Sequence, residues 1–176
     1  MTTSGSRAVT LHPMTQPEYD IRIPALVATY AGNLLRSGRT TSATALAESR
    51  RQHAELLPDG LATGRMLFLV ARPAGADDAP PIGWIWVGLP DPAEPQRPAW
   101  IYNIEVDPAH RGNGYGRAVL AAVEPVLTAQ GVTRLGLNVF ADNTVARRLY
   151  ESTGFAVTAQ QMVKPIGPAA ARAEPA

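Results

Sequence analysis

A glycine-rich turn between a strand-like run and a helix-like run restricts the fold of this 176-residue chain more than any other feature. The run WIYNIEV (100–106) is rich in branched and aromatic residues, and residues 115–131 form an apolar helical pattern that ends at Gly131. Between them lies Arg111-Gly-Asn-Gly-Tyr-Gly116. Glycines at a helix start allow a ligand to reach backbone N–H groups, and the helix dipole favours negative charge there. The turn therefore predicts an anion-binding site.

The surrounding pattern predicts a mixed sheet. Strand 100–106, helix 115–131 and a strand over 133–140 make a βαβ unit, whose two strands should be parallel with a right-handed crossover. Runs 64–73 and 81–90 are separated by turn residues and predict an antiparallel hairpin. The expected fold class is α/β (α+β), in a single domain over residues 1–165.

The remaining elements follow from periodicity and from turn residues: a strand over 7–14, helices over 15–38, 41–60 and 142–154, and strand material over 155–165. Pro24 lacks an N–H and clashes with the preceding turn, so the first helix is expected to break or kink there. Thr41 or Ser42 is the expected cap of the second helix. Residues 166–176 are rich in Ala and Pro and predict a loose tail.

Composition argues against several classes of function. The formal net charge is +1 without a long charge run, which disfavours nucleic acid as a partner. No apolar run approaches the roughly 20 residues that would span a membrane, and the polar start lacks a signal sequence, so a soluble cytoplasmic protein is expected. The absence of cysteine excludes a thiolate metal site and a cysteine nucleophile. His12, His53 and His110 lie far apart without ligand spacing, so no metal is expected.

Two of the three familiar families of glycine-rich anion loops fit poorly. A phosphate-binding P-loop requires Lys and then Ser or Thr after its last glycine, but Arg117 and Ala118 follow Gly116 here. A dinucleotide-binding loop has the spacing G-x-G-x-x-G and an acidic residue roughly 20 residues later. The spacing here is G-x-G-x-G, and the strand that follows carries no acidic residue.

The third family fits at two places. Residues 111–116 match R/Q-x-x-G-x-G/A and closely resemble the coenzyme A loop of the GNAT superfamily, the acetyl-CoA-dependent N-acetyltransferases. Residues 143–155 resemble that family's segment N-x-x-A-x-x-L-Y-x-x-x-G-F. The resemblance covers roughly residues 64–165, which would be the cofactor-binding core, whereas 15–60 match the family's acceptor-side helices by position only. It implies a mostly antiparallel sheet whose two parallel strands splay to hold coenzyme A.

The resemblance also implies which residues hold acetyl-CoA or coenzyme A. The pyrophosphate would lie on the amides of 112–116, and the pantetheine arm would bond to the main chain of Ile104 and Val106. Asn138 would lie opposite, and Asn143 would open the next helix near the cofactor. The expected cofactor-binding set is Ile104, Val106, Arg111, Gly112, Asn113, Gly114, Tyr115, Gly116, Arg117, Asn138, Asn143 and Ala146.

Two side chains are candidates for the chemistry. An alkyl amine is neutral to only about 1 part in 10³ at pH 7, so a base must remove its proton. Alternation along strand 100–106 places Trp100, Tyr102, Ile104 and Val106 on one face and Ile101, Asn103 and Glu105 on the other. Glu105 therefore points away from the more apolar face and is the candidate base, acting directly or through a water. Tyr150 is the general acid that the resemblance implies, and the backbone N–H of Val106 would meet the developing oxyanion.

The resulting hypothesis is an N-acetyltransferase. It would transfer an acetyl group from acetyl-CoA to a primary amine of a small molecule, by direct attack in a ternary complex and without a metal. A protein N-terminus or lysine is the alternative acceptor. A non-catalytic acyl-CoA-binding or regulatory domain is the alternative outside enzymes, and a homodimer is compatible with the resemblance.

Overall fold

The computed structural model describes residues 7–164, and this part of the chain forms five strands and four α-helices. Two short 3-10 turns, Gly60–Ala62 and Pro108–His110, complete the regular structure. In chain order the elements are β1 (Val9–Pro13), α1 (Gln16–Arg36), α2 (Ala45–Leu56), β2 (Met66–Pro73), β3 (Gly83–Gly88), β4 (Ala99–Val106), α3 (Tyr115–Ala129), β5 (Leu135–Leu137) and α4 (Thr144–Glu151).

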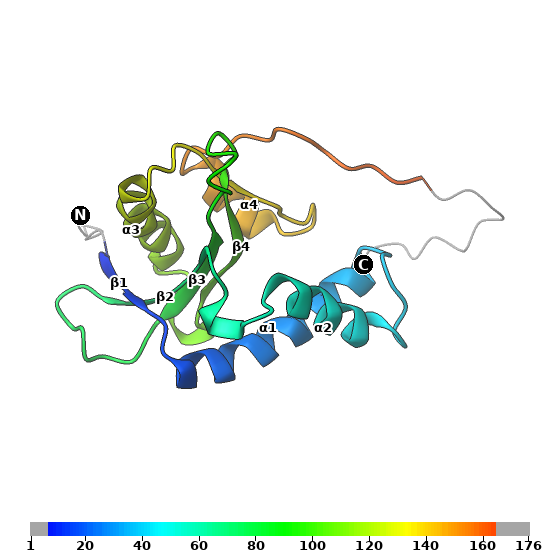
Figure 1. Cartoon of the computed structure of the whole chain (residues 1–176), viewed down its shortest axis with the longest axis horizontal. Coiled ribbons are helices and arrows are strands. Elements are labelled where there is room, and N and C mark those ends of the chain that lie inside the picture. The colour runs from blue at the N-terminus through cyan, green and yellow to red at the C-terminus, as the bar shows by residue number, and fades with distance from the viewer. Residues whose placement is uncertain (1–6, 165–176) are drawn as a thin grey trace.

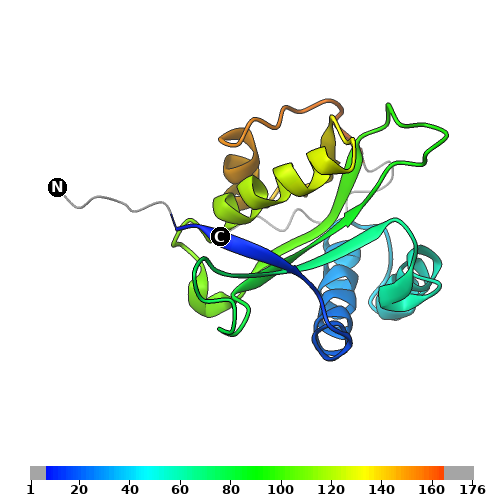
Figure 2. The ribbon, with the colours of Figure 1, turned by 60° about the vertical axis from the view of Figure 1, so that its left-hand side comes forward.

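The five strands form one sheet in the order β1-β2-β3-β4-β5. The first three pairings are antiparallel and the β4–β5 pairing is parallel, which confirms the predicted mixed, mostly antiparallel sheet and its βαβ unit. Helices α3 and α4 cover one face of the sheet, and α1 and α2 lie against the other (Figure 1, Figure 2). None of the helices in residues 7–164 combines the length and the apolar character needed to cross a membrane.

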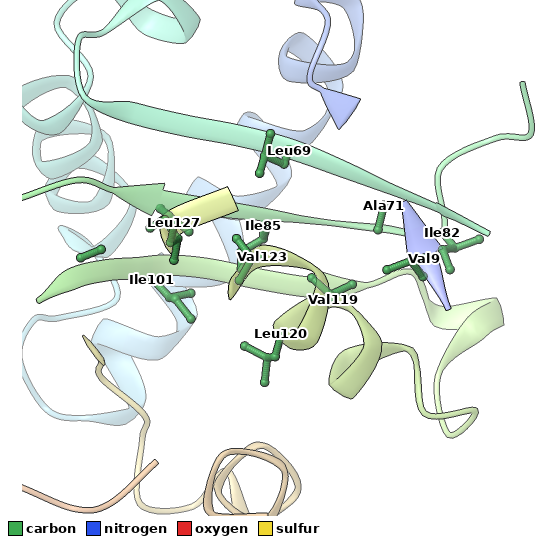
Figure 3. Close-up of a cluster of buried hydrophobic side chains, with 12 residues drawn as sticks. Val9, Leu69, Ala71, Ile82, Ile85, Ile101, Val119, Leu120, Val123 and Leu127 are labelled. Carbon is green, nitrogen blue, oxygen red and sulfur yellow. The ribbon is translucent and has the colours of Figure 1, made fainter. Parts of the chain in front are cut away.

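Strand β3 is the middle strand of the sheet. All six of its residues are buried, because helices cover both faces of this strand. Ile85 joins the larger core cluster together with Val119 and Val123 of α3 (Figure 3). Val87 belongs to the same cluster. Trp84 and Trp86 point the other way and form a second cluster with residues of α1 and β2. The two clusters fix the helices on opposite faces of the sheet.

Of the break or kink predicted at Pro24, the break is wrong, because α1 runs without interruption from Gln16 to Arg36 with Pro24 inside it; the kink stays a prediction. A proline within a helix costs about 3 kcal/mol. The turns after Pro24 bury Val27, Ala31 and Leu34, and burying an aliphatic side chain is worth roughly 1.5–3 kcal/mol. Packing against the rest of the protein thus outweighs the local penalty.

Three other boundaries differ from the sequence prediction. Helix α2 begins at Ala45 with Thr44 at the cap position, so neither Thr41 nor Ser42 occupies it. Strand β5 covers Leu135–Leu137 instead of 133–140. Residues 155–164 contain no strand, and Val157, Met162 and Val163 in this segment are exposed. Without a neighbouring strand or a buried face, β propensity alone does not produce a strand. The predicted tail at 166–176 lies outside the described residues.

Candidate active site

The pairing of β4 with β5 ends well before β4 itself ends. The register runs through Ala99–Leu135 and Trp100–Gly136 and stops at Ile101–Leu137. Strand β4 continues to Val106 and remains paired on its other side with β3, where Val106 lies opposite Gly83. The last five residues of β4 therefore have one edge that no strand of the described chain covers. That uncovered edge can accept an extended ligand through main-chain hydrogen bonds.

A β-bulge in β4 shifts which side chains face which way. The register with β3 passes from Trp86–Asn103 to Val87–Ile101, so Tyr102 has no partner of its own. Ile101 and Ile104 consequently lie on the same face, in the core cluster under α3. The simple alternation assumed from the sequence is wrong across the bulge, because an extra residue inverts the order of the faces.

Glu105 lies on the face that carries α1, opposite Trp84 in the register. Its carboxylate accepts a hydrogen bond from the Trp84 indole at 3.0 Å through Oε2, and Oε1 lies 3.6 Å from Nη2 of Arg111. The sequence predicts that Glu105 points away from the more apolar face, but the face on which it lies also carries the buried rings of Trp84 and Trp86. Glu105 itself is partly exposed and lines a cavity of about 410 Å³ between α1 and the end of β4.

The glycines of the turn are needed for two different reasons. Gly112 (φ 75°) and Gly114 (φ 83°) adopt the left-handed region, which residues with a Cβ rarely occupy. Gly116 instead allows close packing: a Cβ there would lie 2.9 Å from Cδ2 of Leu149 in α4. Gly114 is the N-cap of α3, and the first N–H groups of the helix have no partner within it. The turn therefore presents backbone donors at the start of a helix.

The polar side chains of the turn differ in what they contact. Arg111 donates from Nε to the carbonyl of Val106 at 2.9 Å. Asn113 donates to the carbonyls of His110 and Arg111 and so holds the turn itself. Arg117 donates to the carbonyl and the hydroxyl of Ser152 at 2.9 and 2.8 Å, which ties α3 to the end of α4. Of the two arginines predicted to bind the cofactor, Arg111 is the one that contacts β4.

Tyr115 opens α3 beside the turn. Its hydroxyl accepts a hydrogen bond from Arg7 at 3.3 Å, and the ring meets His110 edge to face with 6.0 Å between centroids.

Helix α4 carries the second group of predicted residues. Asn143 caps the helix by accepting the N–H of Ala146 at 3.1 Å, so these two predicted cofactor residues are joined to each other. Asn138 is exposed and directly follows β5. Tyr150 packs edge to face on Phe155 and belongs to the side chains around the α3 cluster. Burial raises the pKa of the Tyr150 hydroxyl above its usual value near 10, so the hydroxyl keeps its proton at neutral pH.

The structure thus places the two candidate catalytic residues on opposite faces of the sheet. Glu105 lies on the α1 face next to Trp84, whereas Tyr150 lies on the α3 face. The uncovered edge of β4 separates them. Arg111 lies 3.6 Å from the Glu105 carboxylate and donates to the Val106 carbonyl, and the turn lies next to α4 through the Gly116–Leu149 approach.

Sequence reasoning missed three residues beside Glu105. Nothing in the local sequence assigns Trp84 to the site, yet its indole N–H donates to the Glu105 carboxylate. Arg22 of α1 donates to both carboxylate oxygens of Asp107, at 3.0 and 3.2 Å, and thereby joins α1 to the start of the glycine turn. Both contacts link residues that are distant in sequence, so no local pattern could reveal them.

One polar group near the site has no partner. The side-chain nitrogen Nδ2 of Asn103, at the bulge, is buried and makes no hydrogen bond among the described residues. Within the same residues no group of three or more His, Cys, Asp or Glu side chains could hold a metal ion.

Comparison with known proteins identifies relatives of the whole arrangement. The family model of the acetyltransferase (GNAT) family matches residues 38–155. The uncharacterised N-acetyltransferase YycN of Bacillus subtilis is 31% identical over 156 residues, which make up 89% of this chain and 97% of YycN. The crystal structure of YycN matches with a TM-score of 0.84 and covers 92% of this chain and 100% of that one. A ribosomal protein bS18-alanine N-acetyltransferase of Haemophilus ducreyi is 42% identical over 57 residues, 32% of this chain and 39% of that protein.

Proposed function

The chain belongs to the acetyltransferase (GNAT) family and is an acyltransferase, and from this premise we propose that it transfers the acetyl group of acetyl-CoA to a primary amine of a small molecule. Transfer is direct, in a ternary complex of enzyme, acetyl-CoA and amine. The observation that carries the proposal is the contact of Glu105 with Arg111 at the mouth of the glycine turn. A carboxylate that can accept a proton thereby lies next to a site that can hold a coenzyme A phosphate.

The residues present fit acetyl-CoA as the co-substrate. The pyrophosphate oxygens would accept hydrogen bonds from the free N–H groups at the start of α3, and the guanidinium of Arg111 would supply a positive charge. The pantetheine arm would pair with the uncovered edge of β4, through the main chain of Ile104 and Val106. Arg111 now donates to the Val106 carbonyl at 2.9 Å, so we expect it to leave that atom when phosphate competes for the guanidinium.

Glu105 acts as the base in this proposal. The amine must lose a proton before it attacks the thioester carbonyl, and the proton passes to Glu105 directly or through a water. Trp84 fixes the carboxylate by its indole N–H, so Oε1 is the oxygen left for the amine. A backbone N–H of β4, at Val106, would stabilise the oxyanion of the tetrahedral intermediate.

Tyr150 acts as the acid on the other side of the thioester. When the C–S bond breaks, the sulfur of coenzyme A takes the hydroxyl proton of Tyr150 and leaves as a thiol. Burial raises the pKa of Tyr150, so the hydroxyl carries its proton at neutral pH but is also a weaker acid than an exposed tyrosine. Base and acid on opposite faces suit a reaction centre held between them, at the edge of β4 where β5 ends.

Turnover separates this proposal from its alternatives. Acetyl-CoA incubated with the protein and a panel of primary amines should release free coenzyme A thiol, at a rate that rises with pH as more amine becomes neutral. Saturable binding of acetyl-CoA without thiol release would instead favour an acyl-CoA-binding or regulatory domain. Turnover with peptide N-termini alone would favour a protein acceptor, as the name of the Haemophilus ducreyi relative suggests.

Glu105→Gln is expected to lower kcat by about 10²-fold at pH 7, within the range for a general base. Glutamine keeps the size of the side chain and can still accept the Trp84 hydrogen bond, but it takes no proton. The rate should recover partly by pH 9–10, where the solution deprotonates more of the amine. The measurement is the pH profile of kcat, with Glu124→Gln on the exposed surface of α3 as the control. A Glu105→Gln profile that follows the parent's would remove Glu105 from the mechanism.

A further inference from the structure

We infer that the cavity between α1 and the end of β4 is the acceptor pocket, and that it takes a small primary amine with an uncharged, mainly aliphatic body. The inference rests on the proposed acetyl transfer, because it assigns the second substrate of that reaction. Glu105 forms part of the cavity wall, so an amine inside the cavity meets the proposed base directly.

One stripe of α1 forms the wall that faces Glu105. Glu18, Ile21, Arg22 and Ala25 all line the cavity. Their spacing of three and four residues places them on a single side of the helix. Ile21 is 75% exposed although it is apolar, and Ala25 is also exposed. The cavity therefore offers uncovered apolar surface to the carbon skeleton of a ligand.

The charges around this surface are already paired, apart from one oxygen. Glu18 binds Arg72 at 2.9 Å, and Arg22 uses both its terminal nitrogens on Asp107. Oε1 of Glu105 lies 3.6 Å from Arg111, longer than a direct hydrogen bond, and Arg111 is the residue expected to turn to the cofactor phosphate.

This pairing predicts which charged groups on a substrate the cavity accepts. An amine cation finds its counter-charge at Glu105. A carboxylate on the carbon next to the amine would lie near the like-charged Glu105. Arg22 could not neutralise it, because both its terminal nitrogens bind Asp107. Amino acids with a free carboxylate should therefore be poor acceptors compared with the matching amines.

The size of the cavity favours a small acceptor. Its volume of about 410 Å³ is near the lower end of the roughly 300–1,000 Å³ typical of small-molecule sites. Pro81, just before β3, lines it together with the α1 stripe. This volume suits an amine with a short branched chain such as 3-methylbutylamine.

The test compares two alanines on the same helix. Ala25 lines the cavity, whereas Ala28 is also exposed but lines a separate groove between α1 and α2, beside Leu46. Ala25→Phe should raise both the KM and the Kd of 3-methylbutylamine by about tenfold or more, because the ring fills the space that the amine needs. Ala28→Phe should leave both values within twofold of the parent, and the KM for acetyl-CoA should be unchanged in both variants. Binding is measured by NMR titration of the coenzyme A-saturated protein, and turnover by thiol release.

A second comparison tests the charge. Leucine, leucine amide and 3-methylbutylamine share one aliphatic chain and differ at the position next to the amine. With kcat/KM expressed per neutral amine, leucine should be at least about tenfold poorer than leucine amide.

The possible outcomes test the acceptor pocket and the proposed acetyl transfer separately. Equal effects of Ala25→Phe and Ala28→Phe, or leucine as good an acceptor as its amide, would overturn the inference and leave acetyl transfer intact. Amine binding that Ala25→Phe weakens, without any thiol release by the parent, would keep the pocket and reject the proposed function. A parent that neither binds nor acetylates these amines would reject both.

Discussion

Gly114→Val is expected to lower the affinity for coenzyme A by about 10²-fold, since a charge-assisted hydrogen bond is worth about 1.5–3 kcal/mol and the turn would lose at least one. Gly114 has φ 83°, in the left-handed region, and a Cβ at this position would have no neighbour within 4 Å. The added Cβ therefore meets no clash in the ligand-free protein. Its branched side chain would instead stand where we expect the phosphate to approach the start of α3.

Backbone strain has to be separated from loss of the phosphate site. A residue with a Cβ in the left-handed region costs roughly 1–2 kcal/mol, so the variant also loses stability. Gly131, at the other end of α3, supplies the matched control because it has φ 76° and equally open surroundings. Gly131→Val should lose similar stability but keep the parent's affinity for coenzyme A. Calorimetry that finds unchanged affinity in a folded Gly114→Val protein would refute the loop assignment.

Tyr150→Phe is expected to lower kcat by about 10²-fold and to leave the KM for acetyl-CoA within twofold of the parent. A positioned general acid contributes about 10²–10⁴ in rate, and the low end is expected here. The reference pKa of a thiol is near 8.5 and that of tyrosine near 10, so the proton transfer is uphill. Burial raises the pKa of Tyr150 further, which makes this transfer harder still. The ring keeps its packing on Phe155, so the fold should be preserved.

The control for Tyr150 is Tyr30→Phe, which deletes a hydroxyl that donates to Gln52 between α1 and α2, on the other side of the sheet. This variant should turn over at the parent's rate. If Tyr150 only packs in the core, both phenylalanine variants will behave alike. Steady-state rates of Tyr150→Phe within twofold of the parent, measured at saturating acetyl-CoA with chemistry rate-limiting, would rule out the acid role.

Local patterns in the sequence predicted the strand–helix–strand unit and the helix cap of α4, which the structure confirms. The glycines at 112 and 114 require positive φ, a conformation that depends on the residue's own sterics and is therefore visible in the sequence. Asn143 caps α4 through the N–H three residues later, which is again a short-range interaction. The βαβ unit was predictable from the spacing of apolar residues along the chain and from the fixed handedness of such crossovers.

Long-range packing changed the elements whose local preference is weak or ambiguous. Pro24 predicted a break, but buried residues in the following turns keep α1 continuous. The run 133–140 has strand propensity, yet its pairing with β4 stops at Ile101–Leu137 and β5 ends there. The apolar residues near 157 and 163 pair with no strand and remain exposed.

The sequence by itself determined where a glycine turn begins a helix and leaves its first N–H groups free, because φ and helix capping depend on neighbouring residues. Only the tertiary structure decided which way Glu105 points and what it contacts. The bulge at Tyr102 inverts the faces of β4, and cross-strand register brings the indole of Trp84 to the carboxylate. The α1 stripe faces this carboxylate because the sheet and helices pack as layers. These contacts join residues far apart in the chain, and the free energy of burying surface between layers selects them.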